Sequence, residues 1–117
     1  MPQLMEQPFQ PPRVRPLAQA LGIDEPEMRR LMGKSAKLGH TYRVAHDHYF
    51  LASAVRQLAA HVAALCEEQG IAKAAPFRDR IDTGRKLAIQ ILEFFDTIGY
   101  TRRIKEHHVI RQPAMWA

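Results

Sequence analysis

Residues 15–40 read RPLAQALGIDEPEMRRLMGKSAKLGH, which is the pattern of two helices joined by a tight turn. Pro16 suits the first position of a helix, and Gly22 suits a left-handed cap at its end. Asp24 and Glu27 have the spacing of residues that cap the next helix reciprocally. A helix, a turn containing glycine and a second helix together make a helix-turn-helix.

A hairpin pattern follows the second of these helices. That helix carries an inward stripe at three- and four-residue steps, formed by Met28, Leu31, Ser35 and Leu38. The next segment, HTYRVAHDHYFL at residues 40–51, has two arms rich in β-forming residues around a polar tip. Two helices and a hairpin form a winged helix if another helix precedes them. Only the proline-rich residues 1–11 stand there, so we expect that first helix to be incomplete.

The same pattern recurs in the second half of the chain at a constant offset of 60 residues. LGHT at residues 38–41 aligns with IGYT at residues 98–101, and His48 aligns with His108. Apolar residues of the preceding helices agree at the same offset. The chain therefore contains two copies of one small module.

A longer helix precedes the second copy. Its apolar residues recur at steps of four and three until a glycine ends the run, and they are Leu51, Val55, Leu58, Val62 and Leu65, followed by Gly70. We then expect a short strand at residues 71–75, a short helix at 76–81, a longer helix at 83–98 and a second hairpin at 100–111.

These elements predict a fold that is mostly α with small β-hairpins, built from tandem winged-helix modules. The first module spans residues 1–51 and has an incomplete first helix. The second module spans residues 52–112, and residues 113–117 form a tail.

The composition is that of a globular protein, with 46% hydrophobic and 25% charged residues. No apolar run approaches the roughly 18 residues of a membrane span, and the N-terminus is too polar for a signal peptide. The single cysteine, Cys66, excludes an internal disulfide and fits a reducing compartment. These features predict a cytoplasmic protein.

Two motifs that suggest chemistry have the wrong spacing for it. MGKS at residues 32–35 ends like a phosphate-binding loop, but Met28 stands where that loop needs its first glycine. The histidines at positions 46, 48, 107 and 108 lie near the hairpin tips without the four-ligand spacing of a zinc site. No nucleophile and base arrangement stands out either. We therefore expect no catalytic residues, no metal site and no enzyme activity.

The net charge of +5 is concentrated in the C-terminal half. Residues 1–70 carry eight Lys and Arg against seven Asp and Glu, a net of +1. Residues 71–117 carry nine against five, a net of +4. A basic half of this kind indicates a polyanionic partner such as a nucleic acid, although a merely solvated basic surface is the alternative.

In the second copy, the cations gather at one end of the helix predicted at residues 83–98. Its outward face carries an acid, Glu93, at mid-length, which a helix lying between the phosphates of a DNA groove should avoid. Arg85 and Lys86 stand at its start, where free backbone amides also attract anions and where Asp82 or Thr83 would provide a cap. We expect this end to grip a phosphate backbone.

The two faces of that helix and the cations around it define the expected surface. The inward face is Leu87, Ile91, Phe95 and Ile98, and the outward face is Lys86, Gln90, Glu93 and Thr97. Other cations should converge on the helix start to form one basic patch, namely Arg78, Arg80, Arg102, Arg103 and Lys105. The first copy has its own basic stripe of Arg30, Lys34 and Lys37, for which a solvated face is the favoured interpretation.

FRDRIDTGRKLAIQILEFFDTIGYTRR, at residues 77–103, closely resembles the C-terminal region of the bacterial selenocysteine-specific elongation factor, the SelB family. The combination of its Phe-Arg-Asp-Arg, Thr-Gly-Arg-Lys and Gly-x-Thr-Arg-Arg pieces is specific. A looser match extends over PPRVRPLAQALGIDEPEMRRLMGKSAKL at residues 11–38. In that family this region is a chain of winged-helix modules that follows a GTPase body.

The resemblance implies that the last module binds the selenocysteine-insertion (SECIS) hairpin of a messenger RNA. A stop codon is thereby decoded as selenocysteine during translation. The major groove of A-form RNA is too narrow for a helix, so recognition must come from unpaired bases and backbone contacts. The resemblance implies as RNA-binding residues Arg78, Arg80, Thr83, Gly84, Arg85, Lys86, Gln90, Arg102 and Arg103. The cations would hold phosphates, while Gln90 and backbone amides would read extruded bases.

The same resemblance implies an mRNA hairpin as partner, with the ribosome and selenocysteinyl-tRNA reached only through the full-length factor. It implies a monomer with no membrane partner. It implies no cofactor for this chain, because GTP and Mg belong to the GTPase body. Two other classes of function stay open, which are a tandem winged-helix regulator of double-stranded DNA and a winged-helix module for protein contacts.

Overall fold

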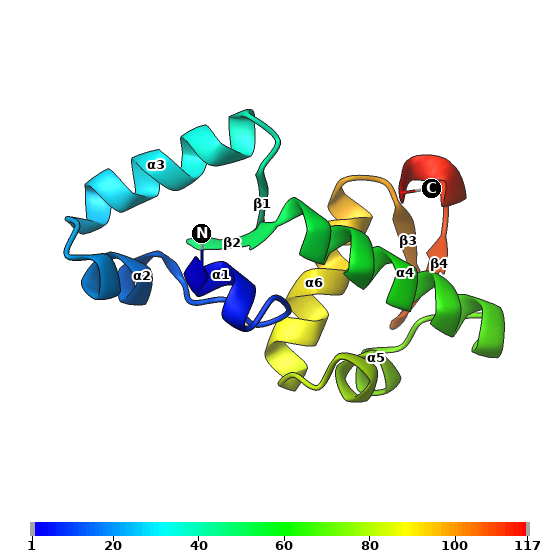
Figure 1. Ribbon diagram of the computed structural model, residues 1–117. Coiled ribbons are helices and arrows are strands. Elements are labelled where there is room, and N and C mark those ends of the chain that lie inside the picture. Colours follow the sequence, from blue (N-terminus) through cyan, green and yellow to red (C-terminus); the bar gives the residue numbers. More distant parts are fainter. Residues whose placement is uncertain (1, 117) are drawn as a thin grey trace. The chain divides into compact units, whose positions relative to one another are not determined.

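The computed structural model describes residues 2–116, with side chains from residue 4 onward. The chain divides into two compact units, residues 1–55 (unit 1) and residues 56–117 (unit 2). Each unit contains a helix pair followed by a two-stranded antiparallel hairpin, here called its wing (Figure 1). The prediction of mostly helical tandem winged-helix modules with small hairpins is confirmed.

Unit 1 contains three helices and one wing, and the next helix begins in it. In chain order its elements are α1 (Pro2–Glu6), α2 (Val14–Leu21), α3 (Glu25–Lys37), β1 (Thr41–Ala45) and β2 (His48–Leu51). The strands pair with Tyr42 opposite Phe50, and the register shifts between Arg43 and Ala45. The first helix, expected to be incomplete, is the five-residue α1, in which Leu4 is buried.

At the turn between α2 and α3, the predicted glycine cap is confirmed, but the predicted reciprocal cap and the predicted position of Pro16 are wrong. Gly22 ends α2 with a φ of 65°, in the left-handed region that favours glycine. The predicted reciprocal cap is wrong, because Asp24 occupies the N-cap without a side-chain hydrogen bond and Glu27 is held by Arg30. A guanidinium is a stronger partner for a carboxylate than a neutral amide is. The helix α2 begins at Val14, so Pro16 lies two residues inside it.

The core of unit 1 is smaller than the predicted stripe suggests. Its buried cluster consists of Leu4, Val14, Leu17, Ala18, Met28, Met32 and Tyr49. Leu31 and Leu38 were predicted to face inward, but they are 40% and 64% exposed. The five-residue α1 is too short to cover the whole face of the 13-residue α3, so only the Met28 and Met32 side of α3 is buried.

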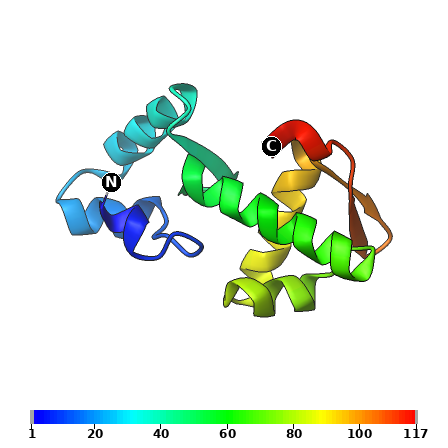
Figure 2. The ribbon, with the colours of Figure 1, turned by 45° about the vertical axis from the view of Figure 1, so that its right-hand side comes forward.

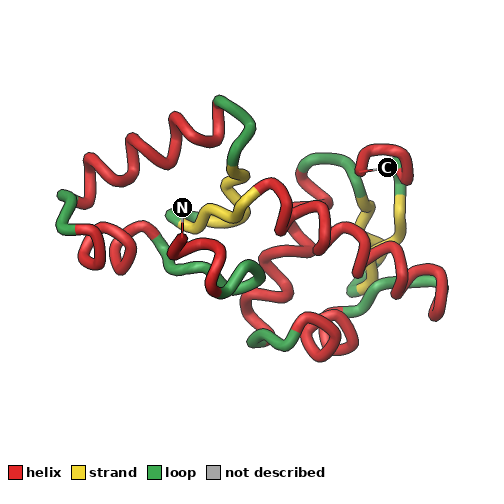
Figure 3. Tube along the Cα trace, in the orientation of Figure 1, coloured by secondary structure: helices red, strands yellow, loops and turns green. Residues whose placement is uncertain are grey.

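Unit 2 repeats the arrangement and is more complete. Its elements are α4 (Ala52–Gln69, which begins in unit 1), α5 (Ala74–Ile81), α6 (Arg85–Thr97), β3 (Thr101–Ile104), β4 (His107–Ile110) and the short 3₁₀ helix η1 (Pro113–Trp116). The helices α5 and α6 begin and end at the positions that the sequence repeat aligns with the ends of α2 and α3. The 18-residue α4 crosses α6 in both ribbon views (Figures 1 and 2), and the wing follows α6 along the tube (Figure 3).

Buried apolar side chains line the helices of unit 2 at the expected spacing. In α4 the predicted residues Leu58, Val62 and Leu65 are buried. In α6 Ile91 and Phe95 are fully buried, as predicted, together with Ala88 and Leu92, while Leu87 and Ile98 are half-buried. The buried hydroxyl of Tyr100 donates a hydrogen bond to the carbonyl oxygen of Ala59 in α4 (3.1 Å).

Segments outside the helix pair close unit 2. The strand predicted at residues 71–75 is reduced to one bridge, in which Ala72 and His108 exchange both backbone hydrogen bonds (2.8 and 3.0 Å). Trp116, in the predicted tail, lies edge-on to Phe95 and Tyr100. No helix in residues 2–116 is long and apolar enough to cross a membrane.

Candidate nucleic-acid interface

The N-terminal end of α6 is open to solvent. Asp82 closes α5 in the left-handed conformation (φ 55°), and Gly84 takes the N-cap of α6 in an extended conformation. The predicted cap by Asp82 or Thr83 is therefore wrong, since the N-cap has no side-chain hydrogen bond. The first amides of a helix have no partner within it, so those of α6 remain available to an anion.

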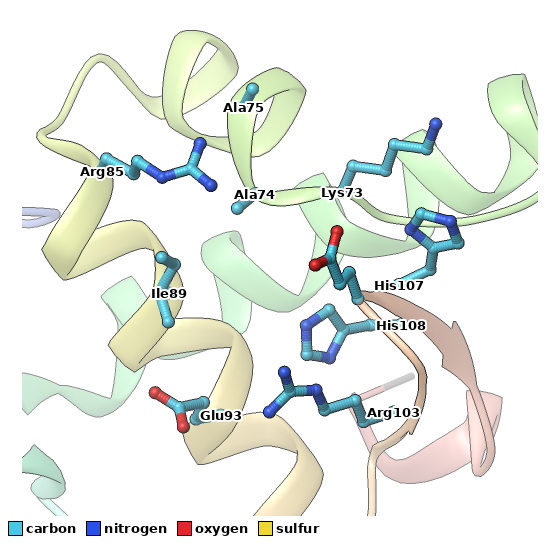
Figure 4. Close-up of a pocket in the computed structure, with 10 residues that line it drawn as sticks. Lys73, Ala74, Ala75, Arg85, Ile89, Glu93, Arg103, His107 and His108 are labelled. Atoms are coloured by element: carbon cyan, nitrogen blue, oxygen red, sulfur yellow. The ribbon is translucent and has the colours of Figure 1, made fainter.

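Cations from three elements surround a cavity of about 340 Å³ beside α6, here called the wing cavity (Figure 4). Its lining residues come from the start of α5, one face of α6 and the wing, and they are Lys73, Ala74, Ala75, Arg85, Ile89, Glu93, Arg103, Glu106, His107 and His108. Arg85 and Arg103 thus lie on two different elements of one concave surface. Figure 4 shows the Glu93 carboxylate and the Arg103 guanidinium facing each other across it.

A second hollow, here called the helix groove, runs along the exposed face of α6. It is lined by Arg85, Lys86, Ile89, Gln90 and Glu93. Arg85, Ile89 and Glu93 line both hollows, so the two adjoin along the first turns of α6. Of the predicted site residues, the structure therefore brings together Arg85, Lys86, Gln90 and Arg103.

Two predicted arginines on α5 are engaged elsewhere. Arg80 donates to Nδ1 of His61 (3.0 Å) and to the Glu68 carboxylate (3.2 Å), and both partners lie on α4. Burial, and then the charge of Arg80, lowers the pKa of His61, which favours the neutral ring that accepts this bond. Arg78 pairs with the adjacent Asp79 (3.1 Å) and lines neither hollow among the described residues. The prediction that both converge on the helix start is wrong for Arg80.

Arg102 is separated from Arg103 by the alternation of the strand. Neighbouring side chains in a β-strand point to opposite faces, and the face that carries Arg103 is the one on the wing cavity. Arg102 is exposed and lines neither hollow among the described residues. A single patch containing both arginines was predicted, and of the two only Arg103 lines the wing cavity.

The turn residues Thr83 and Gly84 have a different environment from the cations. Thr83 is half-buried, and its Oγ1 is buried without a hydrogen-bond partner in the described part of the chain. Gly84 is exposed, with no atom within 4 Å of the position that a Cβ would take. Neither residue lines the two hollows, so their contribution to an interface would come from the backbone at the helix start.

Several lining residues were not predicted from the sequence. Lys73 precedes α5, and Glu106 and His107 lie in the wing, yet all three line the wing cavity. They meet because Ala72 pairs with His108 and so brings the start of α5 beside the wing. The strand predicted at residues 71–75 was the available signal, because its pairing with the wing places Lys73 beside His107.

The arrangement is that of a binding surface. It offers three cations and two carboxylates, apolar walls at Ala74, Ala75 and Ile89, and free amides at the helix start. In residues 2–116, no group of three or more His, Cys, Asp and Glu lies close enough together to hold a metal ion. Such a surface fits a backbone phosphate together with a flat, unpaired base.

Comparisons with known proteins agree with this geometry. A family model described as "Elongation factor SelB, winged helix" matches residues 64–110. The chain is 41% identical over 103 residues to the selenocysteine-specific elongation factor of Escherichia coli (strain K12), covering 88% of this chain and 17% of that protein. It is 38% identical over 98 residues to the factor of the same name from Haemophilus influenzae, covering 84% and 16%. The chain thus spans about a sixth of the length of these relatives.

A solved structure matches both units. The mRNA-binding domain of elongation factor SelB from E. coli, in complex with SECIS RNA, superimposes with a TM-score of 0.86 and is 41% identical. The match covers 89% of this chain and 86% of that one.

Proposed function

Because this chain belongs to the SelB family of selenocysteine-specific elongation factors, we propose that it binds a hairpin in messenger RNA and so serves selenocysteine incorporation during translation. The observation that carries the proposal is that Arg85, Lys86 and Gln90 in the first turns of α6, and Arg103 on the wing, line two adjoining hollows of unit 2. The E. coli domain with the same fold was solved with SECIS RNA bound.

The geometry of the surface favours RNA over duplex DNA. A recognition helix in a DNA major groove presents its side to the bases and is flanked by phosphates, which would repel Glu93 on the exposed face of α6. An RNA hairpin instead exposes a phosphate backbone that cations can hold at one end of a helix, together with unpaired bases. In this proposal Arg85, Lys86 and Arg103 hold phosphates, and Gln90 reads an unpaired base in the helix groove.

The role proposed for this chain is binding and not catalysis. Handling of GTP, of selenocysteinyl-tRNA and of the ribosome is proposed only for a full-length factor, of which the E. coli relative is about six times as long as the matched region. A translation factor of this kind works in the cytoplasm, and we expect the chain to bind one hairpin as a monomer.

The proposal is tested by fluorescence anisotropy with three labelled probes. They are a SECIS hairpin RNA, the same stem with its loop bases replaced, and a DNA duplex of the same stem sequence. We expect tight binding to the first probe and weaker binding to the other two, because unpaired bases and an A-form backbone are both required. Equal or tighter binding to the DNA duplex would favour a DNA-binding regulator, and binding to none of the probes would favour a protein-contact module.

A further inference from the structure

One carboxylate near the end of α6 binds both strands of the wing in unit 2. Asp96 accepts a hydrogen bond from Oγ1 of Thr101 at the start of β3 (2.6 Å). It also faces Nδ1 of His108 in β4, with its two oxygens at 3.0 and 2.9 Å. Because a carboxylate only accepts hydrogen bonds, Nδ1 of His108 must carry the proton. These three residues are called the polar clamp below.

Two of the clamp residues are buried, the Asp96 side chain is 19% exposed, and the place of Asp96 on the helix is otherwise unfavourable. Thr101 is 1% exposed and His108 is 7% exposed. An acidic side chain in the last turn of a helix stands at the negative end of the helix dipole, so Asp96 needs compensating donors. The hydroxyl and the imidazole supply them, which fixes the distance between the end of α6 and the wing.

One cross-strand pair connects the polar clamp with the wing cavity. His108 lies directly opposite Arg103 in the hairpin, and directly opposite side chains share a face of the sheet. Both line the wing cavity. The backbone of His108 is also bonded to Ala72, so its position is fixed from α6 and from the start of α5 together. Whatever fixes His108 therefore fixes the strand that carries Arg103.

Unit 1 shows that the fold does not need the clamp. In the repeat that aligns His48 with His108, Ala36 stands in place of Asp96, while the threonine is retained as Thr41. In the described part of the chain, Oγ1 of Thr41 and Nδ1 of His48 have no hydrogen-bond partner. His48 instead bonds through Nε2 to the carbonyl oxygen of Pro11 (2.6 Å). A wing forms in unit 1 all the same.

We propose that Asp96 and His108 are positioning residues of the RNA-binding surface, which hold the wing at the spacing that places Arg103 across the wing cavity from Arg85 and Glu93. This inference rests on the RNA-binding function proposed above. The clamp residues need not touch RNA, because they act through Arg103. Unit 2 carries both Asp96 and the cationic surface, whereas unit 1 has Ala36 at the aligned position and lacks that surface.

A double-mutant cycle distinguishes positioning from a purely structural role. Asp96→Asn removes the charge but keeps the size of the side chain, so the unit should stay folded. We expect about fivefold weaker binding of a SECIS hairpin by Asp96→Asn, about tenfold by Arg103→Ala, and no further loss when the two are combined. Losses that multiply in the double variant, or no loss in Asp96→Asn, would overturn the inference.

Two further variants keep the result unambiguous. Thr101→Val removes one donor without altering charge, and its cycle with Arg103→Ala should show the same non-additivity. Asp47→Asn weakens a different contact between wing and helix in unit 1, where Asp47 binds Arg29, and should leave the affinity within about twofold. Failure of the unaltered chain to bind the hairpin would instead overturn the proposed function itself.

Discussion

The two units share one fold but have opposite charges at the start of the second helix of the pair. Helix α3 of unit 1 begins with acidic residues, Glu25 and Glu27, whereas α6 of unit 2 begins with Arg85 and Lys86. The anion-attracting end of α3 thus already has carboxylates beside it. The same winged-helix fold thus presents an acidic helix start in one unit and a basic helix start in the other, and only the basic one attracts an anion.

An ion network occupies the wing side of α3. Arg29 donates two hydrogen bonds to Asp47 at the wing tip (both 2.8 Å) and one to Glu25 (2.9 Å). The hydrogen bond from Arg29 holds the pKa of Asp47 below its usual value. The equivalent position in unit 2 is Ile89, an uncharged wall of the wing cavity. In unit 1 this cation is therefore bound to the wing of its own unit, while unit 2 has no cation at the equivalent position of its helix.

The largest effect is expected on the stability of unit 2, from a core residue that has no large apolar counterpart in unit 1. Phe95 is fully buried in α6, whereas its counterpart in α3 is the half-buried Ser35. Phe95→Ala should lower the free energy of unfolding of unit 2 by about 3–5 kcal/mol, because it removes a large apolar side chain and leaves a cavity.

The fluorescence of Trp116, which lies against Phe95, reports urea unfolding of unit 2. Ser35→Ala in unit 1 is the control, followed by far-UV circular dichroism because Trp116 lies in unit 2, and it should change stability by no more than about 0.5 kcal/mol. Similar losses in both variants would mean that the two cores are equally filled.

The next effect concerns RNA binding. Arg85→Ala and Lys86→Ala should each weaken binding of a SECIS hairpin about tenfold, because each removes a cation from the surface around the helix start. Lys34→Ala, on the exposed face of α3, should change it by less than about twofold. The dissociation constants should be measured at one fixed salt concentration. Equal losses in all three variants would place the RNA elsewhere.

A pH effect should appear in unit 1. Burial lowers the pKa of His48 below 6.5, so the folded state favours the neutral ring. As the pH falls through 6.5 the unfolded chain takes up protons more readily than the folded one, and stability is lost. We expect the amide signals of unit 1 to be lost at a temperature a few degrees lower at pH 5.5 than at pH 7.5. His48→Gln should remove this difference, and an unchanged difference would assign it to another group.

The smallest effect is expected at the turn between α5 and α6. Asp82 has a φ of 55° where the equivalent residue of unit 1, Gly22, has 65°. A residue with a Cβ is strained in this region, so Asp82→Gly should stabilise unit 2 by about 0.5–1 kcal/mol. It should also strengthen RNA binding slightly, since it removes an acid near Arg85. A loss of stability in urea unfolding would show that the Asp82 side chain contributes a contact that outweighs the strain.

Most of the fold could be predicted from the sequence because the spacing of apolar residues within each segment predicts its helix or strand. The internal repeat, the wing hairpins and the inward residues Ile91 and Phe95 follow from patterns that each element carries itself. The predictions that were wrong concern residues whose burial depends on another element of the unit. Leu31 and Leu38 have helical spacing, but burial requires a covering helix, and α1 has only five residues.

The candidate site could be predicted only in part, for a similar reason. Arg85, Lys86 and Gln90 lie on one helix face, so their spacing alone brings them together. Arg80 is removed from the site by partners on α4, which no local pattern reveals. Arg102 could have been separated from Arg103 by the alternation of a strand. Lys73 and His107 join the site through the pairing of Ala72 with His108, which is a tertiary contact.

We expect unit 2, and not unit 1, to bind the RNA hairpin. Amide chemical shifts of the ¹⁵N-labelled chain during titration with a SECIS hairpin test it most directly. We predict large changes at Arg85, Lys86, Gln90 and Arg103, and little change at Lys34 and Lys37 on α3. Changes centred on α3, with the start of α6 unaffected, would instead place the RNA on unit 1.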